Sequence, residues 1–89
     1  TAAIADIILP AATYLEFPSI VTPPYSYPVM SVQQPCTRVG QCRSDYEILK
    51  ALAHHLGFGQ HFWENEEACL DFVLWPSGVT FEELKKMGF

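Results

Sequence analysis

The sequence predicts an α+β fold that is mostly α, with a short N-terminal strand, an extended proline-rich segment and three short helices. Every proline except Pro76 lies within the first 35 residues. Charge is equally uneven, because residues 1–37 contain only two charged side chains, Asp6 and Glu16. Helix-capping patterns, in contrast, are confined to the second half of the chain.

The chain begins with a short apolar run, ADIIL at Ala5–Leu9, which Pro10 ends. The run does not alternate between apolar and polar residues, a pattern typical of a strand buried on both faces of a parallel sheet. Such a strand needs neighbouring strands, and the rest of the sequence offers few. Because proline fixes its own φ and removes a backbone donor, residues 18–35 cannot form a regular helix and are expected to be extended chain lying on a surface.

The first helix is predicted from about Asp45 to Leu56. Ser44 is followed three residues later by Glu47, the spacing of a reciprocal capping box. Gly57 follows as a typical left-handed residue after a helix. Side chains recurring at spacings of three and four residues form one face of this helix: Tyr46, Leu49, Leu52, Ala53 and Leu56.

Two further helices are predicted near the C-terminus. Asn65 is a candidate N-cap with two glutamates in the first turn, and the apolar set of this helix is Cys69, Leu70, Phe72 and Val73, before Pro76 and Gly78. Thr80 and Glu83 repeat the capping-box spacing. Leu84 and Met87 share one face of this third helix, and Gly88 closes it. These patterns divide the chain into residues 1–17, 18–43 and 44–89.

Composition excludes several classes of function. The 89 residues are 49% hydrophobic and 17% charged, with a formal net charge of -5, which disfavours nucleic acid and anionic membranes as partners. No stretch is long and apolar enough to predict a membrane span. Three cysteines cannot pair completely within one chain, so reduced thiols are expected. The first residue is not Met and no signal-peptide pattern follows it, which indicates processing or excision from a longer chain.

Candidate chemistry is sparse. Cys36 and Cys42 precede three histidines, His54, His55 and His61, but the spacing is poor for a structural zinc site, so no metal ligand is predicted. A carboxylate in apolar surroundings can act as an acid or base, yet Asp6 is better explained as a cap or salt-bridge partner at a strand end, and Glu16 as an acceptor of backbone or side-chain hydrogen bonds. No nucleophile triad, phosphate-binding loop or paired carboxylate is present, and no catalytic residue is predicted.

Three motifs carry a resemblance to a known family. The string TAAIADIILPAATYLE at residues 1–16 resembles the T-A-x-x-A-D-[IV]-[VI]-L-P signature, with a later Glu, of the dimethyl sulfoxide reductase family of molybdopterin oxidoreductases. GQCRSDYEIL at residues 40–49 is similar to the family's G-E-A-[RK]-S-D-[WY]-E-I-[LF] helix start, and TFEELK at residues 80–85 to its T-F-E-E-L ending. The chain departs from the family at Gln41 and Cys42, and it lacks the Gly and Asn-Glu-Arg-Arg pattern after Glu16.

The resemblance implies an internal segment of a large catalytic subunit, a fragment of a larger α/β enzyme used in anaerobic respiration. Residues 1–17 would end an α/β domain, 18–43 would cross the surface, and 44–89 would form a small helical unit supporting the region beside the cofactor cleft. The parent would use bis-molybdopterin guanine dinucleotide with Mo or W, and an iron-sulfur cluster. In this segment only Thr13 and Glu16 are expected near that cofactor.

The same resemblance implies partners and leaves alternatives open. The expected partners are the remaining domains of the parent chain and an iron-sulfur electron-transfer subunit, with the compartment open between the cytoplasmic and periplasmic sides of a prokaryote. Family substrates include sulfur, selenium, arsenic and nitrogen oxyanions, formate and S- or N-oxides. The alternative function is a stand-alone helical interaction module that uses the aromatic side chains. An unpaired strand at Ala5–Leu9 also predicts self-association.

Overall fold

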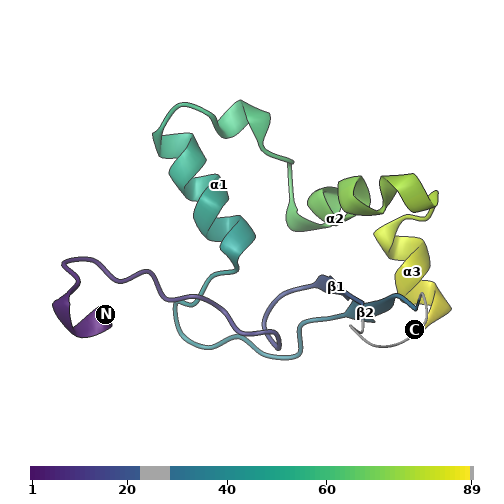
Figure 1. The fold of residues 1–89 in the computed structure, drawn as a ribbon, viewed down its shortest axis with the longest axis horizontal. Coiled ribbons are helices and arrows are strands. Elements are labelled where there is room, and N and C mark those ends of the chain that lie inside the picture. The colour runs from purple at the N-terminus through teal and green to yellow at the C-terminus, as the bar shows by residue number, and fades with distance from the viewer. Residues whose placement is uncertain (23–28, 89) are drawn as a thin grey trace.

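The computed structural model describes residues 1–22 and 29–88, and its fold class is α+β and mostly α, as predicted (Figure 1). These residues contain one two-stranded antiparallel sheet and three α-helices, with single turns of 3-10 helix before the sheet, after α1 and after α2. The expected extended conformation around Pro23–Pro28 lies outside the described residues. The elements are β1 (Ser19–Val21), β2 (Ser31–Gln33), α1 (Asp45–His55), α2 (Glu66–Leu74) and α3 (Phe81–Met87).

The strand predicted at Ala5–Leu9 is absent, so this prediction was wrong in its location. The run follows a 3-10 turn at Ala2–Ile4 and continues as extended chain without a ladder partner. An apolar run becomes a strand only when a neighbouring strand takes up its backbone hydrogen bonds, and the described chain supplies none there. The sheet forms instead between β1 and β2, within the segment predicted to be extended, with Ile20 opposite Val32.

Helix α1 forms where its capping box predicts. Ser44 is almost fully buried, and its hydroxyl accepts from the Glu47 N–H at 3.2 Å while the Glu47 carboxylate accepts from the Ser44 N–H at 3.0 Å. At the other end Gly57 has a φ of 84°, and the Gly57 and Phe58 N–H groups donate to the carbonyls of His54 and Ala53. This is the pattern of a Schellman motif, in which the left-handed conformation favours glycine.

Helices α2 and α3 also begin at their predicted caps. Asn65 accepts from the Ala68 N–H at 2.8 Å, and Thr80 and Glu83 form a second capping box. Asp71, on α2, accepts from the N–H of Phe81 at 2.7 Å, so a side chain of one helix also caps the next. No local sequence pattern indicates this additional cap, because its two residues are ten positions apart.

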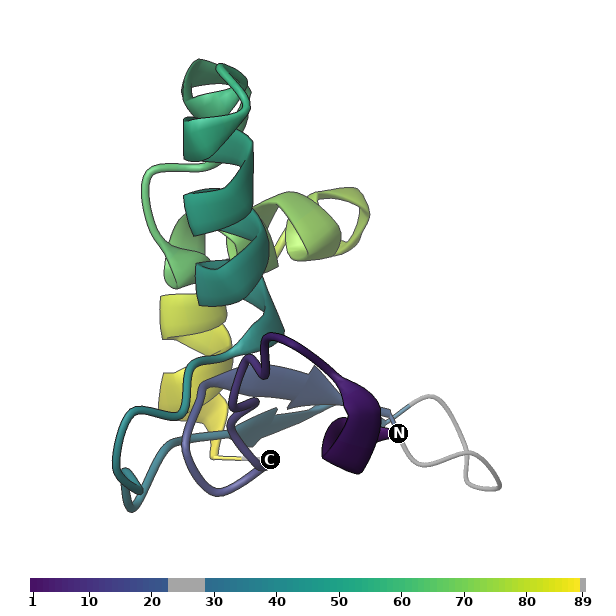
Figure 2. The same cartoon turned by 90° about the vertical axis from the view of Figure 1, so that its left-hand side faces the viewer.

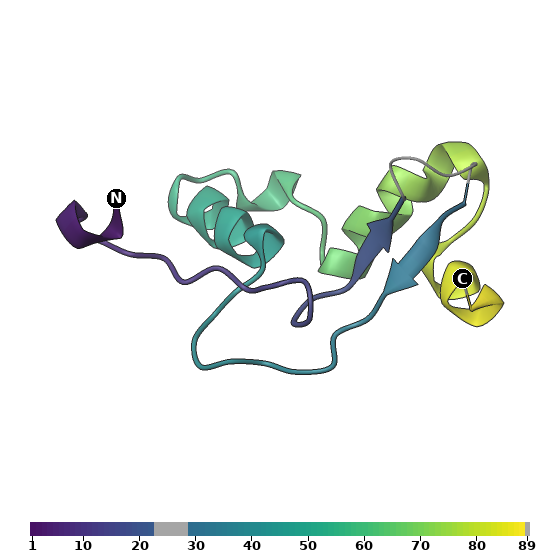
Figure 3. The same cartoon turned by 60° about the horizontal axis from the view of Figure 1, so that its bottom comes forward.

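A buried hydrophobic cluster lies where α2, α3 and the sheet meet (Figure 3). Its buried members are Leu74, Phe81 and Leu84, and the partly buried residues packed against them are Ile20, Val32, Leu70 and Val79. The predicted inward residues Phe72, Val73 and Met87 are instead exposed. Periodicity identifies an apolar face of a helix but not the element against which that face packs. In this fold, the side of α2 that carries Leu70 and Leu74 packs against α3.

Helix α1 rises away from the sheet (Figure 2), and it lies apart from α3 (Figure 1). Of its predicted apolar face, only Ala53 is buried, whereas Leu49, Leu52 and Leu56 are each more than half exposed. A soluble domain rarely leaves such a continuous apolar face in water. The face is therefore suited to packing against further protein.

Candidate functional site

Thr13 and Glu16, the two residues expected near a cofactor, form one hydrogen-bonded loop. The carboxylate Oε2 of Glu16 accepts from the Thr13 N–H at 2.8 Å and from the Thr13 hydroxyl at 3.1 Å. In return, the Glu16 N–H donates to the Thr13 carbonyl at 2.9 Å. The loop is thereby closed on itself, as in a helix-capping turn.

The second carboxylate oxygen of Glu16 reaches across the chain. Oε1 accepts from the Val39 N–H at 2.8 Å, a residue far away in the sequence. The backbone N–H groups of Thr13 and Val39, with a smaller contribution from the Arg38 guanidinium, hold the pKa of Glu16 below its usual range. Glu16 is therefore an ionised acceptor that fixes the loop in place, and not a poised acid.

Backbone contacts extend this connection on both sides of Glu16. The Arg43 N–H donates to the Pro10 carbonyl at 3.1 Å, and the Arg43 carbonyl accepts from the Ala12 N–H at 2.8 Å, which makes a parallel bridge between Ala11 and Arg43. The Leu15 carbonyl accepts from the N–H of Cys36. We call residues 10–16 and 36–43, joined in this way, the clasp. It holds the N-terminal stretch against the start of α1.

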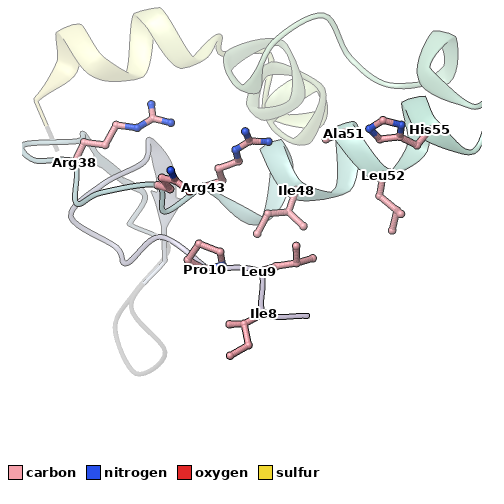
Figure 4. Close-up of a pocket in the computed structure, with 10 residues that line it drawn as sticks. Ile8, Leu9, Pro10, Arg38, Arg43, Ile48, Ala51, Leu52 and His55 are labelled. Atoms are coloured by element: carbon pink, nitrogen blue, oxygen red, sulfur yellow. The ribbon is translucent and has the colours of Figure 1, made fainter. Parts of the chain in front are cut away.

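An apolar groove lies beside the clasp, between residues 8–10 and α1 (Figure 4). Its volume of about 710 Å³ falls in the range of small-molecule sites. The groove is widely open, however, and only its Arg38 and Arg43 end is charged. Arg38 is already paired with Glu47 at 3.5 Å. The other lining residues are Ile8, Leu9, Pro10, Gln41, Ile48, Ala51, Leu52 and His55.

The remaining candidate groups do not assemble into a second site. Within residues 1–22 and 29–88, no three His, Cys, Asp or Glu side chains lie close enough together to hold a metal ion. All three cysteines are free thiols. Burial, and to a smaller degree the nearby Glu66 carboxylate, raises the pKa of the Cys69 thiol, which lowers its reactivity at neutral pH. None of the described helices is long and apolar enough to cross a membrane.

Comparison with known protein families shows the family of the part of the chain that contains the clasp. The molybdopterin oxidoreductase family profile matches residues 1–55, which is more than half of the chain and includes the whole clasp and α1. The chain belongs to the molybdopterin oxidoreductase family. The resemblance seen in the N-terminal signature and at the start of α1 is thus confirmed.

Individual relatives match over nearly the whole chain. A putative dimethyl sulfoxide reductase catalytic subunit from Halobacterium salinarum is 34% identical and covers 94% of this chain. Acetylene hydratase of Syntrophotalea acetylenica is 29% identical over 97% of the chain, and a thiosulfate reductase molybdopterin-containing subunit of Salmonella typhimurium 29% identical over 100%. The match spans only 10 to 12% of the length of these relatives. No solved structure matches the chain.

The described residues do not by themselves fit a pterin dinucleotide. Both carboxylate oxygens of Glu16 and the hydroxyl of Thr13 are engaged in bonds within the clasp. A dinucleotide needs several converging donors and cations around a concave site, whereas the groove is apolar with one guanidinium already paired.

Proposed function

We propose that this chain is a supporting segment of the large subunit of a molybdopterin-dependent enzyme, beside the cofactor cleft, and that catalysis belongs to other regions of the polypeptide. The observation that carries the proposal is the coincidence of the family match, residues 1–55, with the clasp and α1. The family signature thus falls on the part of the chain where segments distant in sequence are hydrogen-bonded together.

In this proposal Thr13 and Glu16 act as positioning residues. The Glu16 carboxylate fixes the loop at residues 13–16 against Val39, so that the loop presents one fixed surface to the cleft. Residues 1–17 and 18–43 then contribute the two halves of the clasp, while residues 44–89 form the helical unit that supports it. A charge-assisted bond to backbone N–H groups suits such a role, because it holds the backbone without needing a partner outside the chain.

The proposed parent binds bis-molybdopterin guanine dinucleotide with Mo or W and carries an iron-sulfur cluster, held by regions outside this chain. The remaining domains of that parent are the proposed partners of the exposed face of α1. The names of the relatives include a hydratase and two reductases, so they favour no single substrate.

A direct test is to purify the full-length polypeptide that carries this chain and, separately, the 89-residue chain. Elemental analysis and pterin fluorescence should find stoichiometric Mo or W and pterin in the full-length protein. The 89-residue chain should bind no cofactor extracted from a molybdoenzyme and turn over no dye donor. Full-length protein without pterin would overturn the enzyme assignment, and saturable micromolar binding by the 89-residue chain would overturn the supporting role.

The alternative, a stand-alone helical interaction module, is favoured by one observation. Trp63 packs against Phe72 of α2 in a tilted arrangement with ring centroids 5.3 Å apart, and both Phe72 and Trp75, which directly follows α2, are largely exposed. Burial of this aromatic stripe within a longer polypeptide accounts for it equally well. The module, in contrast, accounts for no part of the family match over residues 1–55.

A further inference from the structure

Among the described residues, the elements form two groups that are joined by few contacts. The first group is the clasp with α1, and the second is the unit of α2, α3 and the β1–β2 sheet, which the buried hydrophobic cluster holds together. Helix α1 packs mainly on the 3-10 turn at Gly59–His61, which follows it in the sequence (Figure 1). The orientation of the second group relative to the clasp therefore depends on the segments that connect the two groups.

The ribbon formed by β1 and β2 is the first connection, and its pairing stops where it leaves the clasp. Ser19 lies opposite Gln33, so Pro18 occupies the next position toward the clasp. On the partner strand, Pro35 lies two positions beyond Gln33. Proline has no N–H to donate, so the ladder cannot continue regularly past Ser19. The bond from Gln33 Nε2 to the Phe17 carbonyl, at 3.0 Å, remains at this boundary. The ribbon can thus bend here without breaking a ladder hydrogen bond.

The second connection is the segment of residues 58–64, which we call the strap. It leads from the end of α1 to the start of α2 (Figure 1). Two side chains of α1 hold it through its carbonyl groups. The Tyr46 hydroxyl donates to the Trp63 carbonyl at 2.6 Å, and the Lys50 ammonium donates to the Glu64 carbonyl. The strap therefore runs back along α1, toward the end of that helix that follows the clasp.

Trp63 joins the strap to the second group. Its ring packs against the ring of Phe72 on α2, with centroids 5.3 Å apart. On the other side, Trp63 contacts Phe62, and Phe62 contacts Tyr46, each pair with centroids 6.2 Å apart. These separations lie in the range of favourable aromatic pairs. A series of rings thus runs from α1 through the strap to α2, outside the buried cluster.

We propose that the strap is a latch, closed in this structure, and that the unit of α2, α3 and the sheet pivots on the ribbon at Pro18 and Pro35 when the latch opens. Hinge motions of this kind place the change in a few residues at the ends of elements. The contacts that close the latch are two bonds from side chains to carbonyls and one exposed ring contact, each of small net free energy. The clasp and the buried cluster have contacts of their own, so both stay intact as the latch opens. The pivot goes beyond the proposed function, because it makes the supporting helical unit movable relative to the clasp.

Hydrogen exchange in the full-length polypeptide that carries this chain tests the latch. Tyr46→Phe removes the donor to the Trp63 carbonyl and keeps the ring. The amides of Phe62, in the strap, and Ala68, in the first turn of α2, both donate hydrogen bonds in the closed form. In the variant both should exchange roughly fivefold faster, the effect of one lost hydrogen bond. Unchanged exchange at both amides would overturn the proposal.

A second variant weakens the latch from the side of α2. Phe72→Ala removes the ring contact with Trp63, and since Phe72 is 62% exposed the buried cluster loses little. One opening event should expose both amides, so Phe72→Ala and Tyr46→Phe should each speed exchange at Phe62 and at Ala68 by equal factors. Faster exchange at the nearer amide alone would show two separate local openings and overturn the latch. If Tyr46→Phe fails to fold, Phe72→Ala applies the same test.

Matched controls separate the latch from a general loss of stability. Tyr14→Phe removes a hydroxyl from a side chain that is 67% exposed, and Val73→Ala shortens a side chain of α2 that is 62% exposed. Both controls should leave the exchange of the two amides unchanged. In the latch variants, the amides of Val39 in the clasp and Leu84 in α3 should keep their rates, because each group stays intact. Equal acceleration at Val39 and Leu84 would overturn the proposal, as would controls that speed exchange as much as the latch variants do.

Discussion

The Glu16 carboxylate accepts hydrogen bonds from two backbone segments, one at each oxygen. The clasp therefore requires that this carboxyl group is ionised. Its pKa is lowered by the N–H groups of Thr13 and Val39, so its folded pKa lies below its unfolded pKa. A group with a depressed folded pKa contributes stability above its unfolded pKa, and this stability is lost as the pH falls through the folded value. The affected range therefore begins below the ordinary glutamate pKa of about 4.3.

We predict that Glu16→Gln lowers the melting temperature at neutral pH, because an amide cannot accept at both ends as the carboxylate does. The difference from the unmodified chain should shrink as the pH falls below about 4.3, where Glu16 itself becomes protonated. Circular dichroism melts across the pH range measure this. Glu64→Gln is the matched control, since the Glu64 carboxylate makes no bond among the described residues. A pH-independent difference would contradict the assigned role of the charge.

The buried hydroxyl of Ser44 gives the second prediction at this scale. Ser44→Ala should destabilise the chain by about 1 kcal/mol, because the Glu47 N–H at the start of α1 then loses its acceptor. Urea denaturation followed by the helical signal measures the change. Ser19→Ala is the control, since the Ser19 hydroxyl makes only a 3.4 Å contact to the adjacent Ile20 carbonyl. Equal urea midpoints for the two variants would show that the Ser44 hydroxyl does not stabilise α1 as a cap.

At the scale of elements, the contact between α2 and α3 depends on a few groups around Phe81. Phe81 is 1% exposed, and its N–H is bound by Asp71 of α2. A second contact between the two helices is the ion pair of Lys85 of α3 with Glu67 of α2, at 3.0 Å. The Lys85 ion pair is solvent-accessible and contributes little, so the Asp71 bond and the burial of Phe81 are the stronger connections.

We predict that Asp71→Ala destabilises the α2–α3 unit by about 1.5 kcal/mol, because it removes a charged acceptor from a partly buried N–H. Asp71→Asn should lower the free energy of unfolding by less, since the asparagine amide oxygen can still accept from the Phe81 N–H. Guanidinium denaturation of the two variants provides the measurement. If alanine and asparagine were equally destabilising, the hydrogen bond would not be the cause.

The helices show how far the sequence alone could predict this fold. All three begin at the predicted caps, because an N-cap pattern lies within four consecutive residues, as a capping box at α1 and α3 and as Asn65 alone at α2. The pairing of β1 with β2 was not predicted, since three-residue strands carry almost no periodic signal. The outward position of Phe72 was missed for a related reason: which apolar face is buried depends on the neighbouring elements.

The candidate site was predictable only in part. Thr13 and Glu16 were identified through a family signature, and their mutual bonds are local. Val39 and Arg43 complete the clasp, and no local pattern indicates that they bind residues 10–16, although Arg43 lies in the motif at residues 40–49. They contribute backbone groups, and any residue type other than proline offers the same N–H.

At the scale of the whole molecule, apolar surface exceeds what the buried cluster covers. The exposed large apolar residues extend over the N-terminal run, α1 and the outer face of α2. A net charge of -5 opposes association but is small against such a surface. The isolated chain is thus better suited to packing against further protein than to remaining monomeric in solution.

We predict that the isolated chain associates as its concentration rises, because the unpaired edge at Ile7–Leu9 can pair with another copy. Light scattering should report a mean mass above that of the monomer. Ile7→Asp should reduce this association, whereas Val29→Asp adds the same charge at an exposed position outside both the edge and the clasp and should change it little. A monomer at all concentrations would contradict the prediction.

The clasp also determines which contacts can form first while the chain is being synthesised. Its two halves lie on opposite sides of the β1–β2 sheet in the sequence, so residues 10–16 leave the ribosome well before Val39 and Arg43 exist to bind them. The capping boxes, in contrast, can close as soon as four residues have emerged. Contacts between distant residues form late because a long loop must first be closed. During that interval the apolar N-terminal run is the part of the nascent chain most in need of a chaperone.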